Sequence, residues 1–373
     1  MKKKLVAFFM VLAIILSTMI PQNALAETNK ELRSITFSNW IRSLGSQYPL
    51  LQSYGLVVLK QPTLDIKNMS SLTNHQQIAR ENVREWLDEY SPQLIYLNEN
   101  MNGLSQRVDQ YYTRLYELAG EIDNNEQAKI DFLNRFNRLL GNVEDMQADL
   151  KRTSLDLNAY KDLLDSDSKA FSEKATKAVE LLNGHNSEAI QIRETVKGLL
   201  AEIQDELIKI ITNPDEVYDF SFRFGKLLYN TVKTSAETQT VDVASIEAIS
   251  KEIANATSFK TKLSATTIQQ KQQEVTALMK KLSKFEQQAT EVTIVEDQII
   301  GFAEMVKREV AIFDYIVNEF TTLNNIMDKL KDNVLSGEIN PSELQSQLKY
   351  LKEIMLQINK QTEQFEGFTT NIK

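Results

Sequence analysis

Two long stretches of the chain repeat apolar residues at alternating steps of three and four positions. In the first, from Phe132 to Leu181, twelve of the fifteen positions on this step are apolar. The second runs from Val292 to Val334, and only Glu309 interrupts it. A mean step of 3.5 residues keeps successive apolar side chains on a single helix face, as in coiled coils. The pattern therefore predicts two long helices that pack side by side.

The ends of these helices are marked by residues that stop or cap a helix. The first should extend over residues 126–183, a rod of roughly 85 Å at 1.5 Å per residue. Gly184 is a typical helix stop, and Ser187 is a typical cap for the next helix. In the same way, Asn340 and Pro341 should open a last helix after the second rod. The chain has only 11 glycines and 6 prolines, which favours such long elements.

Near the N-terminus we expect a helix over residues 31–59, then a loop, and then helices on both sides of Pro92. The predicted fold class is therefore mainly α, an elongated antiparallel bundle of long helices with a small head. We assign residues 27–212 and 255–373 to the bundle, or tail, and residues 213–254 to a head insert between its two parts.

The head insert departs from the helical period and alternates apolar with polar residues. Phe220, Phe222 and Phe224 form one alternating segment, and Val241 and Val243 belong to a second. A two-residue period is typical of a half-buried strand. We therefore expect an amphipathic β-hairpin, or β-tongue, whose apolar face meets a membrane or a partner protein.

Two features limit this interpretation of the tongue. Phe220, Phe224 and Leu227 also fit one face of a helix, so a helical insert is an alternative. In a hairpin, Lys226 interrupts the apolar stripe unless a bulge at Gly225 moves Leu227 onto the apolar face. A strand that spans a bilayer needs about 9–11 residues with a continuous apolar face. The stripe is too short to cross a membrane alone, and the sequence leaves open whether it enters lipid.

The N-terminal segment predicts export. Three lysines at positions 2–4 precede an apolar run over positions 5–16, and the sequence Ala-Leu-Ala at positions 24–26 is a small-residue cleavage site. These features are typical of a signal peptide over residues 1–26 that is removed from the secreted protein. An uncleaved N-terminal anchor is the alternative.

Composition argues against several classes of function. Removal of residues 1–26 takes away three lysines and no acidic residue, so the formal net charge changes from −9 to −12. A chain this acidic has no general attraction for nucleic acid. It has no cysteine, and its only histidines, His75 and His185, lie outside any HExxH pattern. With no Gly-rich phosphate loop either, the sequence predicts no metal, no cofactor and no enzymatic activity.

Five segments of the chain resemble a known toxin family. They lie at residues 43–62, 68–98, 111–120, 295–302 and 359–372, and the longest reads NMSSLTNHQQIARENVREWLDEYSPQLIYLN. They are similar to the lytic A components of tripartite non-haemolytic enterotoxins, within the wider cytolysin A-like and haemolysin BL-type family of α-pore-forming toxins. The similarity covers essentially the whole chain after residue 26.

This resemblance implies both a fold and a function. Members of the family are secreted, soluble proteins with a long helical tail and a β-tongue head, and they carry no catalytic residues. The implied function is that of one component of a pore-forming toxin. It would join two related partners, of the B and C type, on the target-cell membrane and complete a lytic pore. Without the resemblance, a secreted non-lytic coiled-coil adhesin or structural protein is the alternative.

A toxin of this kind must change shape, and breaks in the helical pattern are the candidate hinges. They are Gly184, Pro214, Gly225 and Gly337, where glycine permits unusual backbone angles and proline removes a helical hydrogen bond. Each of these residues is also interpretable as an ordinary helix terminator.

Overall fold

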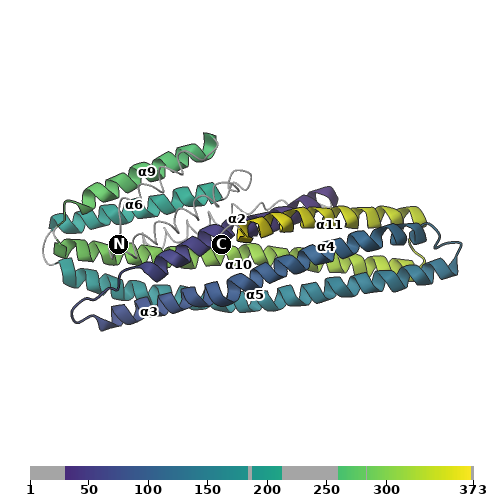
Figure 1. Ribbon diagram of the computed structural model, residues 1–373, viewed down its shortest axis with the longest axis horizontal. Helices are drawn as coiled ribbons and strands as arrows, with labels where there is room; N and C mark the ends of the chain where they lie inside the picture. The colour runs from purple at the N-terminus through teal and green to yellow at the C-terminus, as the bar shows by residue number, and fades with distance from the viewer. Residues whose placement is uncertain (1–29, 184–186, 212–258, 283, 371–373) are drawn as a thin grey trace.

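The structure is a computed structural model that describes residues 30–183, 187–211, 259–282 and 284–370. Within these ranges the regular elements are helices, which confirms the mainly α fold class. The two long helices lie where the apolar repeats predict them, with α5 spanning Glu126–Asn183 and α10 spanning Lys284–Ser336. They run side by side along the length of the molecule (Figure 1).

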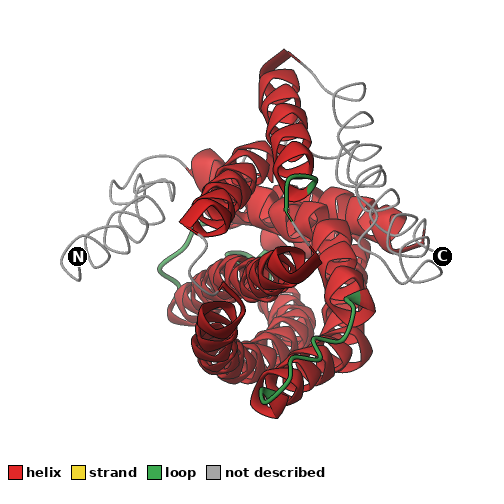
Figure 2. Ribbon diagram, turned by 90° about the vertical axis from the view of Figure 1, so that its left-hand side faces the viewer, coloured by secondary structure: helices red, strands yellow, loops and turns green. Residues whose placement is uncertain are grey.

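Seven further elements complete the described residues. They are α2 (Lys30–Lys60), α3 (Ser70–Glu85), the π-helical turn η1 (Trp86–Tyr90), α4 (Ser91–Ala119), α6 (Ser187–Ile211), α9 (Phe259–Met279) and α11 (Pro341–Thr370). α4 packs on α5 and α11, and α2 packs on α10 and α11. Seen along the long axis, the helices form a bundle around a shared core (Figure 2).

Polar side chains fix the register between α5 and α10. The Ser154 hydroxyl donates a hydrogen bond to Asp314 at 2.6 Å, and the Asn158 amide donates to the same carboxylate at 3.2 Å. Farther along the pair, the Ser172 hydroxyl donates to Glu296. Residue numbers rise on α5 as they fall on α10, so the two long helices are antiparallel.

The predicted seam of α5 is correct over most of its length and wrong at its C-terminal end. Leu181, which the repeat places in the seam, is 62% exposed, whereas Leu182 is 5% exposed and lies in the core. Ala175 is likewise buried in place of Lys174. A straight α-helix drifts by about 20° per heptad from a strict 3.5-residue repeat. Along this 58-residue helix the drift moves the core-facing stripe on by one residue.

The helices predicted on either side of Pro92 are present, but no loop separates them. The π-helical turn joins them, and in it the Ser91 N–H donates to the carbonyl of Trp86, five residues back. A wider turn suits this site because Pro92 has no N–H to donate and its ring crowds the preceding turn. The turn also carries Tyr90, whose ring lies 4.4 Å from that of Tyr160 in α5.

The predicted start of the last helix is confirmed in its atomic detail. The Asn340 side-chain oxygen accepts a hydrogen bond from the Glu343 N–H at 2.9 Å, which is an N-cap, and Pro341 is the first helical residue. Before it, Gly337 adopts φ +74°, the left-handed conformation typical of a helix C-terminus. The long rod and the last helix are therefore joined by a tight, well-defined turn.

Candidate functional site

α6 and α9 form a small helical hairpin that flanks the head insert in sequence. Buried side chains hold its base together: Ala189, Ile192 and Val196 from α6 pack with Leu282, just beyond α9. This cluster is separate from the main core, to which the hairpin contributes through Ile203 and Ile268. The hairpin lies along α10 at one end of the bundle (Figure 1).

The two helices of this hairpin are antiparallel. Lys271 of α9 pairs with Glu202 of α6, and Ser264 of α9 bonds to Glu206 of α6, so residue numbers rise on one helix as they fall on the other. The last residue of α6 and the first residue of α9 therefore lie at the same end of the hairpin. The chain leaves the described structure and returns to it at that one place.

Polar contacts on the hairpin lower the pKa of one of its carboxyl groups, that of Glu206. Burial by itself would raise the pKa of Glu206, but hydrogen bonds from Lys209 and Ser264 outweigh it and lower the pKa of this carboxyl. Glu206 is therefore ionised at neutral pH and holds a charged contact to α9 close to the end from which the insert leaves.

The predicted tongue residues lie outside the described residues. They are Phe220, Phe222, Phe224, Leu227, Val241 and Val243. The same holds for the candidate hinges Gly184, Pro214 and Gly225. The fourth candidate hinge, Gly337, is described, and it forms the C-terminal turn of α10.

α2 packs against the bundle through aromatic and polar contacts as well as apolar ones. Trp40 stacks on Tyr315 of α10 with ring centroids 4.3 Å apart, and the amide of Gln61, the residue after α2, donates to Gln298 of α10 at 2.8 Å. The Tyr48 hydroxyl is hydrogen-bonded to a side chain of α4. This helix therefore sits in a partly polar interface, which the apolar repeats of the sequence do not predict.

Some buried acceptors near α2 have no hydrogen-bond partner. They include the side-chain oxygens of Gln47 on α2 and Gln361 on α11, and both carboxylate oxygens of Glu309 on α10. Glu309 is 1% exposed, and burial raises its pKa well above the ordinary value near 4.5. One signal of this feature is visible in the sequence, since Glu309 is the single polar interruption of the second apolar repeat.

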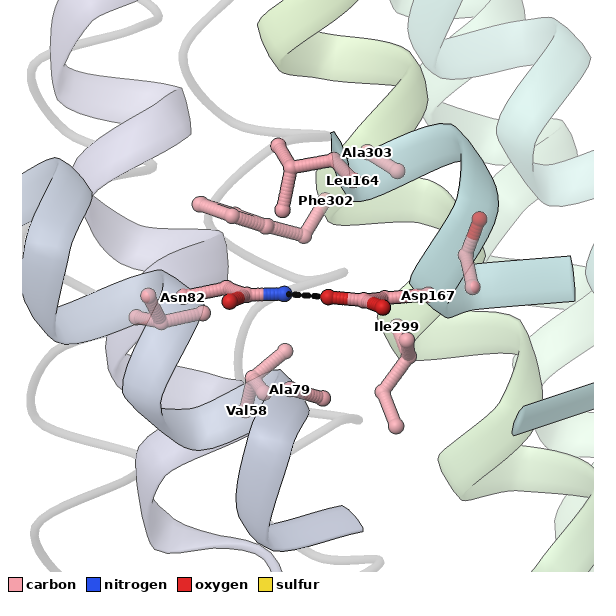
Figure 3. Close-up of a pocket in the computed structure, with 10 residues that line it drawn as sticks. Val58, Ala79, Asn82, Leu164, Asp167, Ile299, Phe302 and Ala303 are labelled. Carbon is pink, nitrogen blue, oxygen red and sulfur yellow. Dashed lines mark hydrogen bonds between the residues drawn. The ribbon is translucent and has the colours of Figure 1, made fainter. Parts of the chain in front are cut away.

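A close-up of the core shows how tightly the bundle is filled. A cavity of about 10 Å³ lies between α3, α5 and α10, where the Asn82 amide donates to Asp167 at 2.8 Å beside Phe302 and Leu164 (Figure 3). That volume suits roughly one water molecule. A larger hollow of about 270 Å³ lies open to solvent between α4 and α11, beside the ion pair of Asp109 with Lys352. The first is too small and the second too open to match the enclosed, mostly apolar pockets in which small ligands bind.

The described residues lack two features that are often linked to function. None of these helices combines the length and the apolar character needed to cross a bilayer. No group of three or more acidic or histidine side chains lies together as metal ligands in the described ranges.

One family model matches nearly half of the chain. Residues 31–206 match the family model of the Bacillus haemolytic enterotoxin (HBL). Over these residues the chain is similar to the haemolytic enterotoxin family. The match covers α2 to α5 and most of α6, so it includes the first long helix and one side of the hairpin. A search of curated proteins found no match to the sequence.

Solved structures of toxin components share the fold. The HblL1 toxin component of Bacillus cereus superposes with a TM-score of 0.66 at 14% identity, over 88% of this chain and 95% of that one. The soluble form of AhlB, from the tripartite α-pore-forming toxin AHL of Aeromonas hydrophila, gives 0.60 at 13% identity, over 89% and 94%. The pore form of AhlB gives 0.53 at 13% identity, over 91% and 98%. The described fold is therefore nearer to the soluble form of AhlB than to its pore form.

Proposed function

We propose that this protein is one component of a multi-component pore-forming toxin. It is secreted in a soluble form and joins partner components on the membrane of a target cell to complete a lytic pore. The observation that carries the proposal is the match of residues 31–206 to the haemolytic enterotoxin family. A secreted coiled-coil adhesin would share the long helices but gives no reason for that match.

The fold supports the same proposal from a second direction. The chain shares its architecture with HblL1 and with the soluble form of AhlB, and the AhlB structures include a pore as well as a soluble protein. AhlB, which shares this fold, therefore has both a soluble form and a pore form. Lysis by this protein would then require a change of shape, for which Gly184, Pro214, Gly225 and Gly337 are the proposed hinges.

The proposed working part is the amphipathic β-tongue within residues 213–254. The α6–α9 hairpin supports this assignment because the insert leaves and re-enters the described structure at one end of it. The alternating Phe220, Phe222 and Phe224 would supply an apolar face toward lipid or a partner protein. Residues 27–212 and 255–373 would form the tail, and residues 1–26 would direct secretion.

The proposed partners are two related components, of the B and C type, and contact with the host cell membrane would depend on them. The protein acts by assembly in this proposal, and no enzymatic step or cofactor is involved.

The proposal predicts lysis that depends on partner components. Added alone to cultured cells loaded with a soluble dye, the purified protein should release no dye. Added after two partner components have bound and the cells have been washed, it should release most of the dye. The same order of addition with buffer in place of this protein is the control. Full release by the protein alone, or none in the presence of partners, would contradict the proposed function.

A further inference from the structure

Glu309 occupies a core position of α10 that an apolar residue would ordinarily fill. Its side chain is 1% exposed, and neither of its carboxylate oxygens has a hydrogen-bond partner. Val306 and Phe313, the seam residues before and after it, are completely buried. Glu296, another buried glutamate of the same helix, accepts a hydrogen bond from Ser172. Glu309 therefore lacks the partner that normally offsets the cost of burying a carboxylate.

The titratable group that faces Glu309 from α2 is Tyr48. Burial raises the pKa of Tyr48, and the nearby negative charge of Glu309 raises it further. The Tyr48 hydroxyl already bonds to the Ser91 hydroxyl of α4 at 2.7 Å. The nearest cations along α2 are Arg42 and Lys60, six and twelve residues from Tyr48. On the α2 side of Glu309, therefore, the Tyr48 hydroxyl is already bonded to Ser91. The nearest cations of α2 lie at least six residues from Tyr48 along the helix.

The groups at the same level of α5 are also engaged elsewhere. The register set by the Ser154–Asp314 hydrogen bond places Tyr160 and Lys161 near the level of Glu309. The Tyr160 hydroxyl donates to a backbone carbonyl of α3 at 2.6 Å, and Lys161 donates to the side chain of its own neighbour on α5, Asn158, at 2.8 Å.

Toward α6, the charged contacts are made by Arg308, the residue next to Glu309 in the chain. Burial lowers the pKa of Arg308, and Glu304 and Asp205 of α6 act in the opposite direction. For Glu309 itself, burial is the cause that raises the pKa, and none of the cations among the described residues counteracts it. α2, α5 and α6 are the helices packed most extensively on α10, and none of them supplies Glu309 with a counter-charge.

We propose that Glu309 is a proton-controlled latch between α10 and α2. When protonated, it packs as a neutral side chain and the two helices stay closed. When ionised, it is an unpaired negative charge in the core, and α2 loosens from α10 around Tyr48 so that water reaches the carboxylate. The latch is a property of the described fold and does not depend on the proposed function.

The direction of the pH dependence follows from the raised pKa. The unfolded chain releases the Glu309 proton near the ordinary pKa of about 4.5, whereas the folded chain keeps it to a higher pH. Between those two values the unfolded state binds fewer protons, so the stability of the folded protein falls as pH rises. For a single proton, the unfolding equilibrium constant rises by about tenfold per pH unit in that window. Glu309 has no such effect at lower pH, where it is protonated in both states.

The test compares the purified full chain with E309Q, which keeps the shape of the side chain but cannot ionise. The matched control is E304Q, a change of a partly exposed glutamate on the same helix that pairs with Lys307. Urea unfolding is followed by circular dichroism from pH 3.5 to 8. The ratio of the unfolding constants of the wild type and E309Q should be near one at the acid end and rise at least tenfold toward neutral pH. The ratio for E304Q should stay flat.

Hydrogen exchange then locates the effect. At neutral pH, amides of α2 around Tyr48 should exchange several-fold faster in the wild type than in E309Q, with little difference at pH 3.5. An unfolding ratio that does not change with pH, an E309Q protein less stable than the wild type at neutral pH, or equal exchange in α2 would each overturn the latch. E309M, an apolar side chain of similar length, should likewise be more stable than the wild type at neutral pH, and a loss of stability in both variants would reject the idea. Neither measurement involves lysis, so failure of the latch and failure of the proposed function are distinguishable.

Discussion

At the scale of single residues, Gly45 sets how closely α2 approaches α11. A Cβ atom at this position would lie 2.6 Å from Cδ2 of Phe365, which is closer than carbon atoms pack. Phe365 is 1% exposed and packs edge-on against Tyr48 with ring centroids 5.6 Å apart, so it has little room to move. The missing side chain at Gly45 therefore allows this helix pair to close.

We predict that G45A destabilises the folded protein by about 1–3 kcal/mol, the usual cost of overpacking a core. The control is G103A in α4, where a new Cβ would meet nothing within 4 Å. Alanine there should be neutral or stabilise by up to about 1 kcal/mol, because it is the better helix former. Urea unfolding of both variants measures the difference. Equal stability of the two would show that Phe365 moves aside freely.

At the scale of helices, Gly337 has an observed role as the end of α10, in the turn before α11, and a proposed role as a hinge. Its φ of +74° is a conformation that costs other residues roughly 1–2 kcal/mol, and the Asn340 cap follows three residues later. These features describe a helix end, and the proposed hinge role would come in addition to them.

We predict that G337A lowers the free energy of unfolding by about 1–2 kcal/mol because alanine is strained at positive φ. Partner-dependent lysis by the remaining folded protein should be unchanged if this glycine is only a terminator. G141A, in the interior of α5 with open space at its Cβ, is the control. A loss of lysis by G337A larger than its loss of folded protein would instead support a hinge at this position.

At the scale of the whole molecule, the predicted tongue stands in sequence between α6 and α9, whose apolar contacts are made by described residues. The base of the hairpin has its own apolar cluster, and the bundle is held by a different and much larger one. Changes in the tongue should therefore affect assembly more than the stability of the bundle.

We predict that replacing Phe222 and Phe224 together with Asp leaves the helical content unchanged and strongly reduces partner-dependent lysis. Two charges on the apolar face of the tongue would oppose burial against lipid or protein. S221D, on the polar face of the same predicted strand, should lyse like the wild type. Circular dichroism and dye release measure the two properties. Unchanged lysis by the double variant would remove the tongue from the proposed mechanism.

The repeat pattern predicted much of the fold because long helices depend on local period. It placed α5 and α10, whereas the capping residue Asn340 and Pro341 marked the start of α11. It missed the exposure of Leu181, because the helix keeps 3.6 residues per turn while the repeat assumes 3.5. It also treated Glu309 only as an interruption, since period alone does not say whether a polar residue at a core position turns outward or stays buried.

The sequence by itself determined the helical class, the two long seams and the chemically distinct insert, because each depends on residues close together in the chain. Only the tertiary structure decided which groups from distant segments meet. It buried Glu309 without a partner near Tyr48, set α2 against α11 at Gly45, and paired α6 with α9 across the insert. Those outcomes depend on the depth and register of packing between helices, which local period does not encode.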